Sequence, residues 1–143
     1  MELDSTIWGP HFWFMLHTIS LIYPKHPNAV IKKKYYDFIQ NIPSFLPDKT
    51  SSNNFKDLLD LYPITPYLDS RESIIKWMHF IHNKVNELLK KKKISIDEFY
   101  VNYYEQYKPR ETKLLEYKKI KEKMVYLVIM VLLLVICYLL YRE

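Results

Sequence analysis

The sequence predicts an all-α domain followed by a membrane-spanning helix. The chain has 143 residues with a single glycine, and hydrophobic residues make up 49% of it. A single glycine disfavours the many tight turns of all-β folds, and this apolar content excludes a disordered chain. Apolar side chains recur at helical spacing in segments separated by prolines, and the last long segment is apolar throughout.

The first helix is expected to begin near Ile7 or Pro10 and to run to Ile22, and its apolar positions from Pro10 onward follow helical spacing. Asp4 and Ser5 are suitable caps for its start, since a short polar side chain accepts a hydrogen bond from a free backbone N–H. Tyr23-Pro24 follows and is expected to end the helix.

Two further helices are predicted before residue 63. One runs over 27–42 and ends at Pro43. Its expected inner face consists of Val30, Tyr35, Phe38, Ile39 and Ile42. Residues 47–54 are polar and are expected to form a loop, after which a helix runs through Phe55 and Leu61.

The fourth and fifth helices have recognisable starts. Ser70 precedes a long apolar-periodic segment over 71–91, with acidic and hydroxyl side chains in its first turn. Ser95 precedes a shorter segment over 96–107, with Glu98 three residues on, which is the spacing of a capping box.

The C-terminal segment 124–141 has 18 residues without a charge. As an α-helix it measures roughly 27 Å, enough to cross a bilayer core. A buried core helix is the alternative, but the segment is apolar on every face and the preceding domain is too small to enclose it. The basic residues that precede it are Lys113, Lys118, Lys119, Lys121 and Lys123. We therefore expect residues 109–123 to form a charged linker helix. We also expect the chain to be a single-pass membrane protein whose N-terminal domain is cytosolic.

Charge and cysteine content exclude several functions. The net charge is +5, but the basic residues gather in two local runs, 90–93 and 113–123, which are typical of solvated faces, so we predict no nucleic-acid binding. The one cysteine, Cys137, lies in the apolar segment. The chain has no second cysteine for an internal disulfide, and we predict no metal site.

The predicted fourth helix carries the most informative polar residues. His82 and Asn86 are four residues apart on one helix face, and Asn83 lies beside them. Since the chain has no glycine-rich phosphate loop, a nucleotide would have to be held by side chains such as these. A histidine on a helix is, however, more often a hydrogen-bonded core residue.

Two motifs resemble the Erv/ALR family of FAD-linked sulfhydryl oxidases. Residues 8–17 read WGPHFWFMLH and match the family pattern WG-x-x-x-W-x-x-LH, and Tyr23-Pro24 follows as in the family. Residues 82–91 match HN-x-VN-x-x-L-x-K. The resemblance covers residues 7–107, and the viral branch, from large cytoplasmic DNA viruses, looks most similar.

The resemblance implies a fold, a cofactor and a set of contacts. The fold is a four-helix bundle with a short fifth helix over residues 1–108, binding FAD and usually forming a homodimer. Carried over by position, the FAD-binding residues are Gly9, Trp13, His17, Tyr23, His82, Asn83, Val85, Asn86 and Lys91. Trp13, His17 and Tyr23 would line the flavin. The second motif would hold the adenine and ribose, Lys91 would lie near the phosphates, and Gly9 would allow close backbone approach.

The chain departs from the family where the family's redox chemistry takes place. The family's PCxxCxxxF reads PDKTSSNNF here, so that Asp48 and Ser51 occupy the cysteine positions. Neither side chain forms a disulfide, and a serine hydroxyl is far too basic to act as a thiolate does. A second, structural disulfide of many members is also missing, because its positions hold His79 and Ile96. We therefore expect no catalytic residues and no autonomous thiol oxidation.

Three functions remain open from the sequence. The first is a membrane-anchored pseudoenzyme that keeps FAD and acts as a partner or scaffold in disulfide formation or virion assembly, in a virion or a host internal membrane. It would form a homodimer, or a heterodimer with an active family member. The alternative is an active FAD-linked thiol oxidase that uses a disulfide supplied by a partner chain. A third is a scaffold without flavin.

Overall fold

A computed structural model describes residues 3–142, and its elements are all helical. The α-helices are α1 (Ser5–Leu21), α2 (Ala29–Asn41), α3 (Lys49–Leu61), α4 (Arg71–Leu88), α5 (Ile96–Glu105) and α6 (Arg110–Arg142). Short 3₁₀ turns lie at Ile42–Phe45 and Thr65–Tyr67. The chain divides after Val101 into two compact units.

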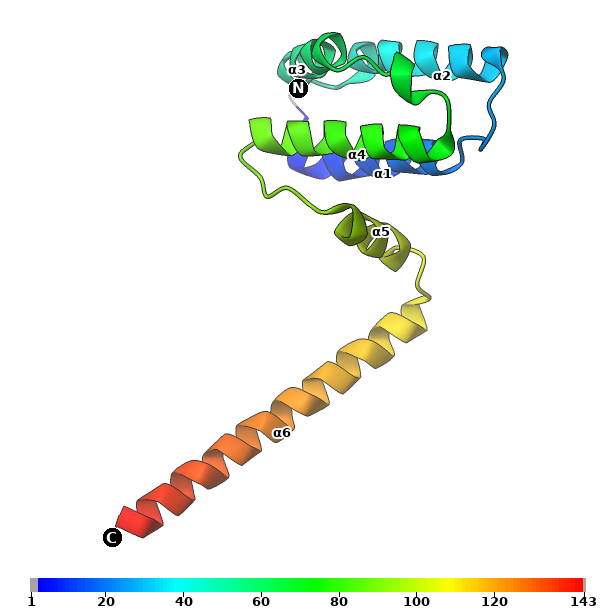
Figure 1. The fold of residues 1–143 in the computed structure, drawn as a ribbon. Coiled ribbons are helices and arrows are strands. Elements are labelled where there is room, and N and C mark those ends of the chain that lie inside the picture. Colours follow the sequence, from blue (N-terminus) through cyan, green and yellow to red (C-terminus); the bar gives the residue numbers. More distant parts are fainter. Residues whose placement is uncertain (1–2, 143) are drawn as a thin grey trace. The chain divides into compact units, whose positions relative to one another are not determined.

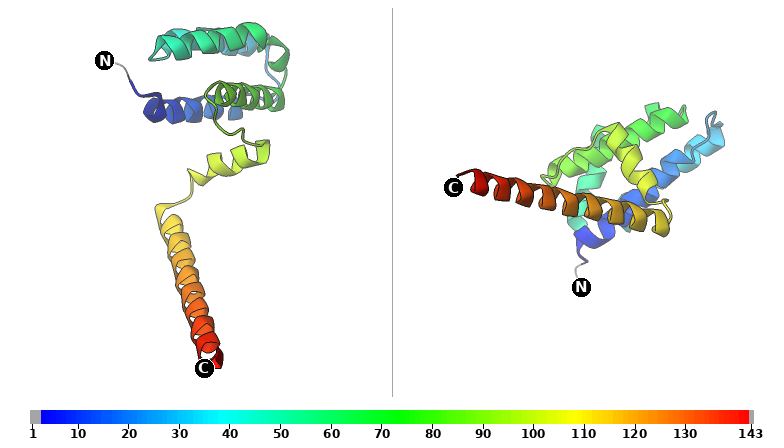
Figure 2. Two further views of the ribbon diagram at one scale, coloured as in Figure 1. Left: turned by 90° about the vertical axis from the view of Figure 1, so that its left-hand side faces the viewer. Right: turned by 90° about the horizontal axis from the view of Figure 1, so that it is seen from below.

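The first unit is a bundle of four helices in two layers. Helix α1 packs along α4, and α2 and α3 form the other layer, as both side views show (Figures 1 and 2). The interior between the layers contains Leu16, Tyr23, Ile39, Ile42, Phe55, Leu58, Leu59, Ile64, Leu68, Ile74, Trp77, Met78 and Ile81. The predicted all-α bundle with a short additional helix is confirmed.

Side-chain caps set where the helices begin. Asp4 Oδ1 accepts a hydrogen bond of 2.8 Å from Thr6 N, and Ser70 Oγ accepts one of 3.1 Å from Ser73 N. Ser95 Oγ likewise accepts from Glu98 N at 3.0 Å, as its spacing predicted. Asp4 caps α1, as the sequence indicated, and the helix therefore begins at Ser5, two residues before Ile7 and five before Pro10, the two predicted starts.

The expected loop over 47–54 was wrong. Helix α3 begins at Lys49, because Asp48 Oδ1 accepts a hydrogen bond of 2.7 Å from Ser51 N and so satisfies one of the free donors of the first turn. The polar residues of this segment are therefore the capped first turns of a helix.

Helices α2 and α4 differ from expectation in detail. Ile39 and Ile42 are buried as predicted, whereas Val30 is 61% exposed and Phe38 is 38% exposed. Fewer apolar residues of this segment are therefore buried than its apolar pattern predicted. Helix α4 ends at Leu88, three residues before the predicted Lys91, and Lys90 follows with a positive φ of 55°. A left-handed residue just beyond a helix redirects the chain.

The second unit consists mainly of α6, a continuous helix of 33 residues. Its most apolar stretch of 18 residues has a mean hydropathy of 2.8, and none of that stretch is buried in the protein. By length and composition this helix could cross a membrane. Helix α6 runs without a break from the charged residues after Arg110 into the apolar segment.

Candidate functional site

Two histidines and a tryptophan meet between α1 and α4. Trp13 and His17 are one turn apart on α1, and His82 lies on α4. The rings of Trp13 and His82 are stacked, with centroids 4.0 Å apart and planes 9° apart. His17 Nε2 lies 2.9 Å from His82 Nδ1, so the two imidazoles share a hydrogen bond. A stacked and hydrogen-bonded arrangement fixes both the position and the rotation of each ring.

Two phenylalanines complete this ring cluster, which we define as Trp13, His17, Phe55, His82 and Phe99. The ring centroid of Phe99, from α5, lies 4.4 Å from that of His17. Phe55, from α3, lies 6.3 Å from Trp13. Both phenylalanines are buried. The cluster therefore joins residues from four helices that are distant in the sequence.

Burial keeps the two histidines neutral. Burial, with smaller contributions from His82 and His79, lowers the pKa of His17 to about 3. Burial also lowers the pKa of His82 to about 4, with contributions from His79 and the positive charge of Lys91. An imidazole with such a pKa is uncharged at neutral pH and offers one N–H donor and one bare nitrogen acceptor.

The second ring nitrogen of His17 lacks a partner. His17 is 4% exposed, and among the described residues its Nδ1 is a buried side-chain nitrogen without a hydrogen bond. A buried polar atom of this kind costs about 1–3 kcal/mol when it stays unsatisfied. Such an atom beside aromatic rings is a natural contact for a polar group of a ligand.

Asn83 and His79 hold the segment that leads to α5. Asn83 Oδ1 accepts from Ile94 N at 3.0 Å, and Asn83 Nδ2 donates to Ile94 O at 2.9 Å. His79 Nε2 lies 2.9 Å from the same carbonyl oxygen. We call these three residues the Ile94 clasp. The side-chain amide of Asn83 pairs with both backbone groups of one residue, so the clasp positions the chain that carries Phe99.

The other predicted cofactor residues of α4 and its end lie close by. Asn86 is buried, and Val85 is partly buried and packs against the core. Asn86 O accepts a hydrogen bond of 2.7 Å from Lys91 N, which turns the chain after α4. Lys91 is exposed, and its charge acts on His82.

Tyr23 and Gly9 are placed differently from the ring cluster. Tyr23 is fully buried, its hydroxyl donates to Leu68 O at 2.7 Å, and its ring lies edge-on to Tyr35. Arg71 Nε donates to Tyr23 O. Tyr23 thus braces the other end of α1. A Cβ added to Gly9 would meet no atom within 4 Å, so the backbone there faces open space.

Sequence reasoning missed Phe55, His79 and Phe99 as parts of this site. His79 could have been found, because it lies four residues before Asn83 and so shares its helix face. Phe99 had no local signal, since its role depends on how α5 returns toward α1.

Asp48 and Ser51 form a helix cap. Their hydrogen bond, from Ser51 N to Asp48 Oδ1, is 2.7 Å long, and Ser52 Oγ donates to Pro43 O at 2.7 Å beside it. Phe55, one turn beyond Ser51, reaches the ring cluster. Ser51 and Phe55 are four residues apart and so share one face of α3, and the start of this helix contains no thiol.

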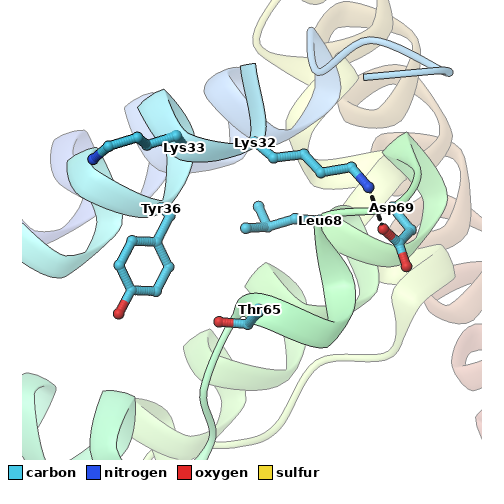
Figure 3. A pocket seen from close by; sticks show the side chains of 6 residues that line it. All are labelled: Lys32, Lys33, Tyr36, Thr65, Leu68 and Asp69. Carbon is cyan, nitrogen blue, oxygen red and sulfur yellow. Dashed lines mark hydrogen bonds and ion pairs between the residues drawn. The ribbon is translucent and has the colours of Figure 1, made fainter. Parts of the chain in front are cut away.

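An open pocket of about 550 Å³ lies elsewhere in the first unit (Figure 3). Its lining residues are Lys32, Lys33, Tyr36, Thr65, Leu68 and Asp69. Lys32 Nζ lies 2.5 Å from Asp69 Oδ1 across it. None of the predicted cofactor residues lines this pocket.

A family model and similar known proteins all indicate the same family. The family model described as the Erv1 / Alr family matches residues 10–108. A probable FAD-linked sulfhydryl oxidase of Acanthamoeba polyphaga mimivirus is 37% identical over 92 residues, which cover 64% of this chain and 64% of that protein. The chain thus spans just under two thirds of that relative's length. An FAD-linked sulfhydryl oxidase of African swine fever virus is 35% identical over 99 residues, covering 69% of this chain and 81% of that protein.

Solved structures agree with the fold. The crystal structure of the yeast Erv1 core has a TM-score of 0.63 and 25% identity, and the match covers 74% of this chain and 85% of that chain. The FAD binding domain of Erv1 from Saccharomyces cerevisiae has the same TM-score and identity, with 73% and 93% covered. Since the family model spans most of the chain and the helical core matches these structures, the chain belongs to the Erv1 / Alr family.

Proposed function

We propose that this chain is a membrane-anchored member of its family that binds FAD but lacks the redox dithiol, and that it acts through a partner. One observation carries the proposal. The five rings of the cluster pack together and leave a buried His17 nitrogen without a hydrogen-bond partner, while Asp48 and Ser51 form a helix cap and offer no thiol.

The residues of the ring cluster fit an aromatic nucleotide cofactor. Neutral imidazoles present a donor or an acceptor to a heterocycle at low electrostatic cost, and His17 Nδ1 is the atom that needs such a contact. Trp13 offers a large half-buried ring for stacking. Lys91 supplies positive charge beside His82, where a phosphate would be neutralised.

Bound FAD would supply an electron acceptor. The chain's own residues would bind it: Trp13 through the ring face that His82 does not cover, and His17 through Nδ1, while His82 would hold the Trp13 ring in place by stacking on its other face. Phe99 lies over His17 and excludes water from it. A thiol that could pass electrons to the cofactor would have to come from another chain, since the only cysteine lies in the apolar part of α6.

The partner of the proposed function is a second copy or an active family member. Helix α1 supports this part, because its face opposite the buried Leu16 carries Ile7, which is 68% exposed, and the partly exposed Phe14. Helix α6 would anchor the assembly, with the lysine-rich side and the N-terminal domain in the cytosol. Such an anchored dimer suits a scaffold for disulfide formation or virion assembly.

The test is the visible absorbance spectrum of the full chain purified in detergent. We expect a protein-bound flavin band, and no oxygen uptake with dithiothreitol. Trp13→Ala should lower FAD affinity at least tenfold, whereas the matched control Phe45→Ala, at an exposed aromatic of the 3₁₀ turn, should not.

A folded protein that stays colourless and cannot be loaded with FAD would refute the cofactor part. Dithiothreitol-dependent oxygen uptake by the purified chain alone would refute the absence of autonomous activity. Uptake that appears only when a dithiol-bearing family member is added would favour the alternative of an active oxidase that borrows a disulfide.

A further inference from the structure

The hydrogen bond between His17 and His82 constrains both rings at once. The two facing atoms, His17 Nε2 and His82 Nδ1, are 2.9 Å apart. With both imidazoles neutral, one of these atoms must carry a hydrogen and the other must be bare. Two facing hydrogens would clash, and two bare nitrogens would repel each other and lose the bond.

Only two arrangements satisfy this constraint. In the first, His17 Nε2–H donates to His82 Nδ1, which leaves His17 Nδ1 bare and places the hydrogen of His82 on Nε2. In the second, His82 Nδ1–H donates to His17 Nε2, which places a hydrogen on His17 Nδ1 and leaves His82 Nε2 bare. The two rings therefore always have the same tautomer, both Nε2–H or both Nδ1–H.

We propose that His17 and His82 form a coupled tautomer pair, in which the group bound at His17 Nδ1 decides whether His82 Nε2 is a donor or an acceptor. The proposal rests on the proposed function in so far as that group belongs to FAD. A ligand atom that donates to His17 Nδ1 selects the first arrangement, and one that accepts from it selects the second.

The same pair can carry one proton through the site. Starting from the first arrangement, a proton that binds His17 Nδ1 is matched by transfer of the Nε2 hydrogen to His82 Nδ1 and by loss of the His82 Nε2 hydrogen to solvent. One proton enters and one leaves, no net charge stays in the buried site, and the pair ends in the second arrangement. His82 is partly exposed, so its far nitrogen is the end from which a proton leaves.

Packing around the pair supports this role. His82 is held flat against Trp13, and His17 is held by Phe99, so neither ring can turn without breaking a ring contact. The low pKa values keep both rings uncharged at pH 7, where the tautomer is well defined. His79, the other histidine near the pair, is held by the carbonyl of Ile94.

The test is long-range ¹H–¹⁵N NMR of the full chain in micelles, labelled with ¹⁵N-histidine, which reads the tautomer of each ring. At pH 7, with and without FAD, we expect matching tautomers for His17 and His82, with the exposed His11 as the internal reference for an uncoupled ring. A mixed pair, one ring Nε2–H and the other Nδ1–H, would overturn the proposal.

Titration with FAD tests the ligand part. We expect both rings to settle into one shared tautomer as flavin fluorescence is quenched. If the fluorescence stays unchanged while the tautomers still match, the pairing stands and FAD binding fails. If FAD binds but only one ring responds, the coupling is refuted.

A variant separates coupling from packing. His17→Phe keeps an aromatic ring against Phe99 but removes both nitrogens, so His82 should lose the tautomer preference that FAD imposes through the pair. In His82→Phe the ligand still contacts His17 directly, so His17 should keep its preference, and this variant also serves to assign the signals. Should either variant fail to fold, the measurement on the unaltered chain still decides the proposal.

Discussion

At the scale of single residues, Asp48 and Ser51 form a helix cap at the two positions where the family resemblance predicts redox cysteines. Their 2.7 Å contact caps α3, and an N-cap of this kind contributes about 1 kcal/mol. The helix start is thus stabilised without cysteines. The same location at a helix N-terminus would lower the pKa of a thiol placed there.

Restoring the dithiol should restore part of the chemistry. We expect Asp48→Cys combined with Ser51→Cys, loaded with FAD, to consume oxygen with dithiothreitol at least tenfold faster than the unaltered chain, measured with an oxygen electrode. Asp48→Ala with Ser51→Ala is the matched control, since it also removes the cap. A restored dithiol that oxidises to a disulfide without reducing the flavin would show that the start of α3 lies too far from the cofactor.

His17 and His82 predict a pH dependence of stability. Their folded pKa values of about 3 and about 4 lie below the ordinary value of 6.5, so the unfolded chain binds more protons than the folded one in this range. Stability is therefore complete above pH 6.5 and falls as the pH drops towards 4, by up to about 1.4 kcal/mol per pH unit for each histidine.

Urea unfolding in micelles, followed by tryptophan fluorescence at several pH values, measures this slope. The double variant His17→Asn and His82→Asn should have a smaller slope over the same range. An unchanged slope in the variant would assign the pH dependence to other groups.

At the scale of elements, the Ile94 clasp connects α4 to α5. Both hydrogen bonds of the Asn83 amide go to the backbone of Ile94, and α5 then brings Phe99 onto His17. The amide predicted to contact a cofactor therefore positions a neighbouring segment. This contact is non-covalent, so its strength depends on the geometry of one amide group.

Replacing Asn83 should loosen the segment around Ile94. Asn83→Leu removes both hydrogen bonds and should destabilise the first unit by about 1–3 kcal/mol. Hydrogen exchange of the Ile94 amide should accelerate at least tenfold. Asn53→Leu, on the exposed side of α3, is the control and should leave this amide unchanged. Equal protection of the Ile94 amide in both variants would contradict the clasp.

At the scale of the whole molecule, the chain joins a helical bundle to one long apolar helix. The apolar part of α6 has no buried stretch in the protein, so its side chains require another apolar environment. A bilayer would provide it, and in the proposed orientation the bundle lies in the cytosol with the lysines that precede the apolar segment.

A charge in the centre of the span should disrupt the anchor. Leu132→Arg costs about 3 kcal/mol at a bilayer centre and should release more of the protein into the soluble fraction on alkaline extraction. Leu140→Arg, near the end of the span, is the matched control with a smaller effect.

The orientation is tested separately. In sealed microsomes, protease added outside should digest the bundle. A bundle that resists the protease would show that the orientation is the opposite of the proposed one.

Much of this protein is determined by local sequence. Helix starts at Ser70 and Ser95 follow from short polar side chains beside free backbone donors, and the apolar segment 124–141 follows from composition alone. The absence of a thiol pair at positions 48 and 51 needs no structure, because a missing atom cannot be supplied by folding. The family motifs predict Trp13, His17 and His82 as FAD-binding residues from local sequence alone, and this assignment stays a prediction.

Only the tertiary structure decided how these residues are used. His17 and His82 are 65 residues apart, and packing of α1 on α4 determines that their nitrogens meet. Packing also buries Tyr23 as a brace, uses Asn83 to hold Ile94, and covers His17 with Phe99. The physical reason is range: capping and hydropathy act over a few residues along the chain, whereas burial and ring contacts depend on which helices become neighbours.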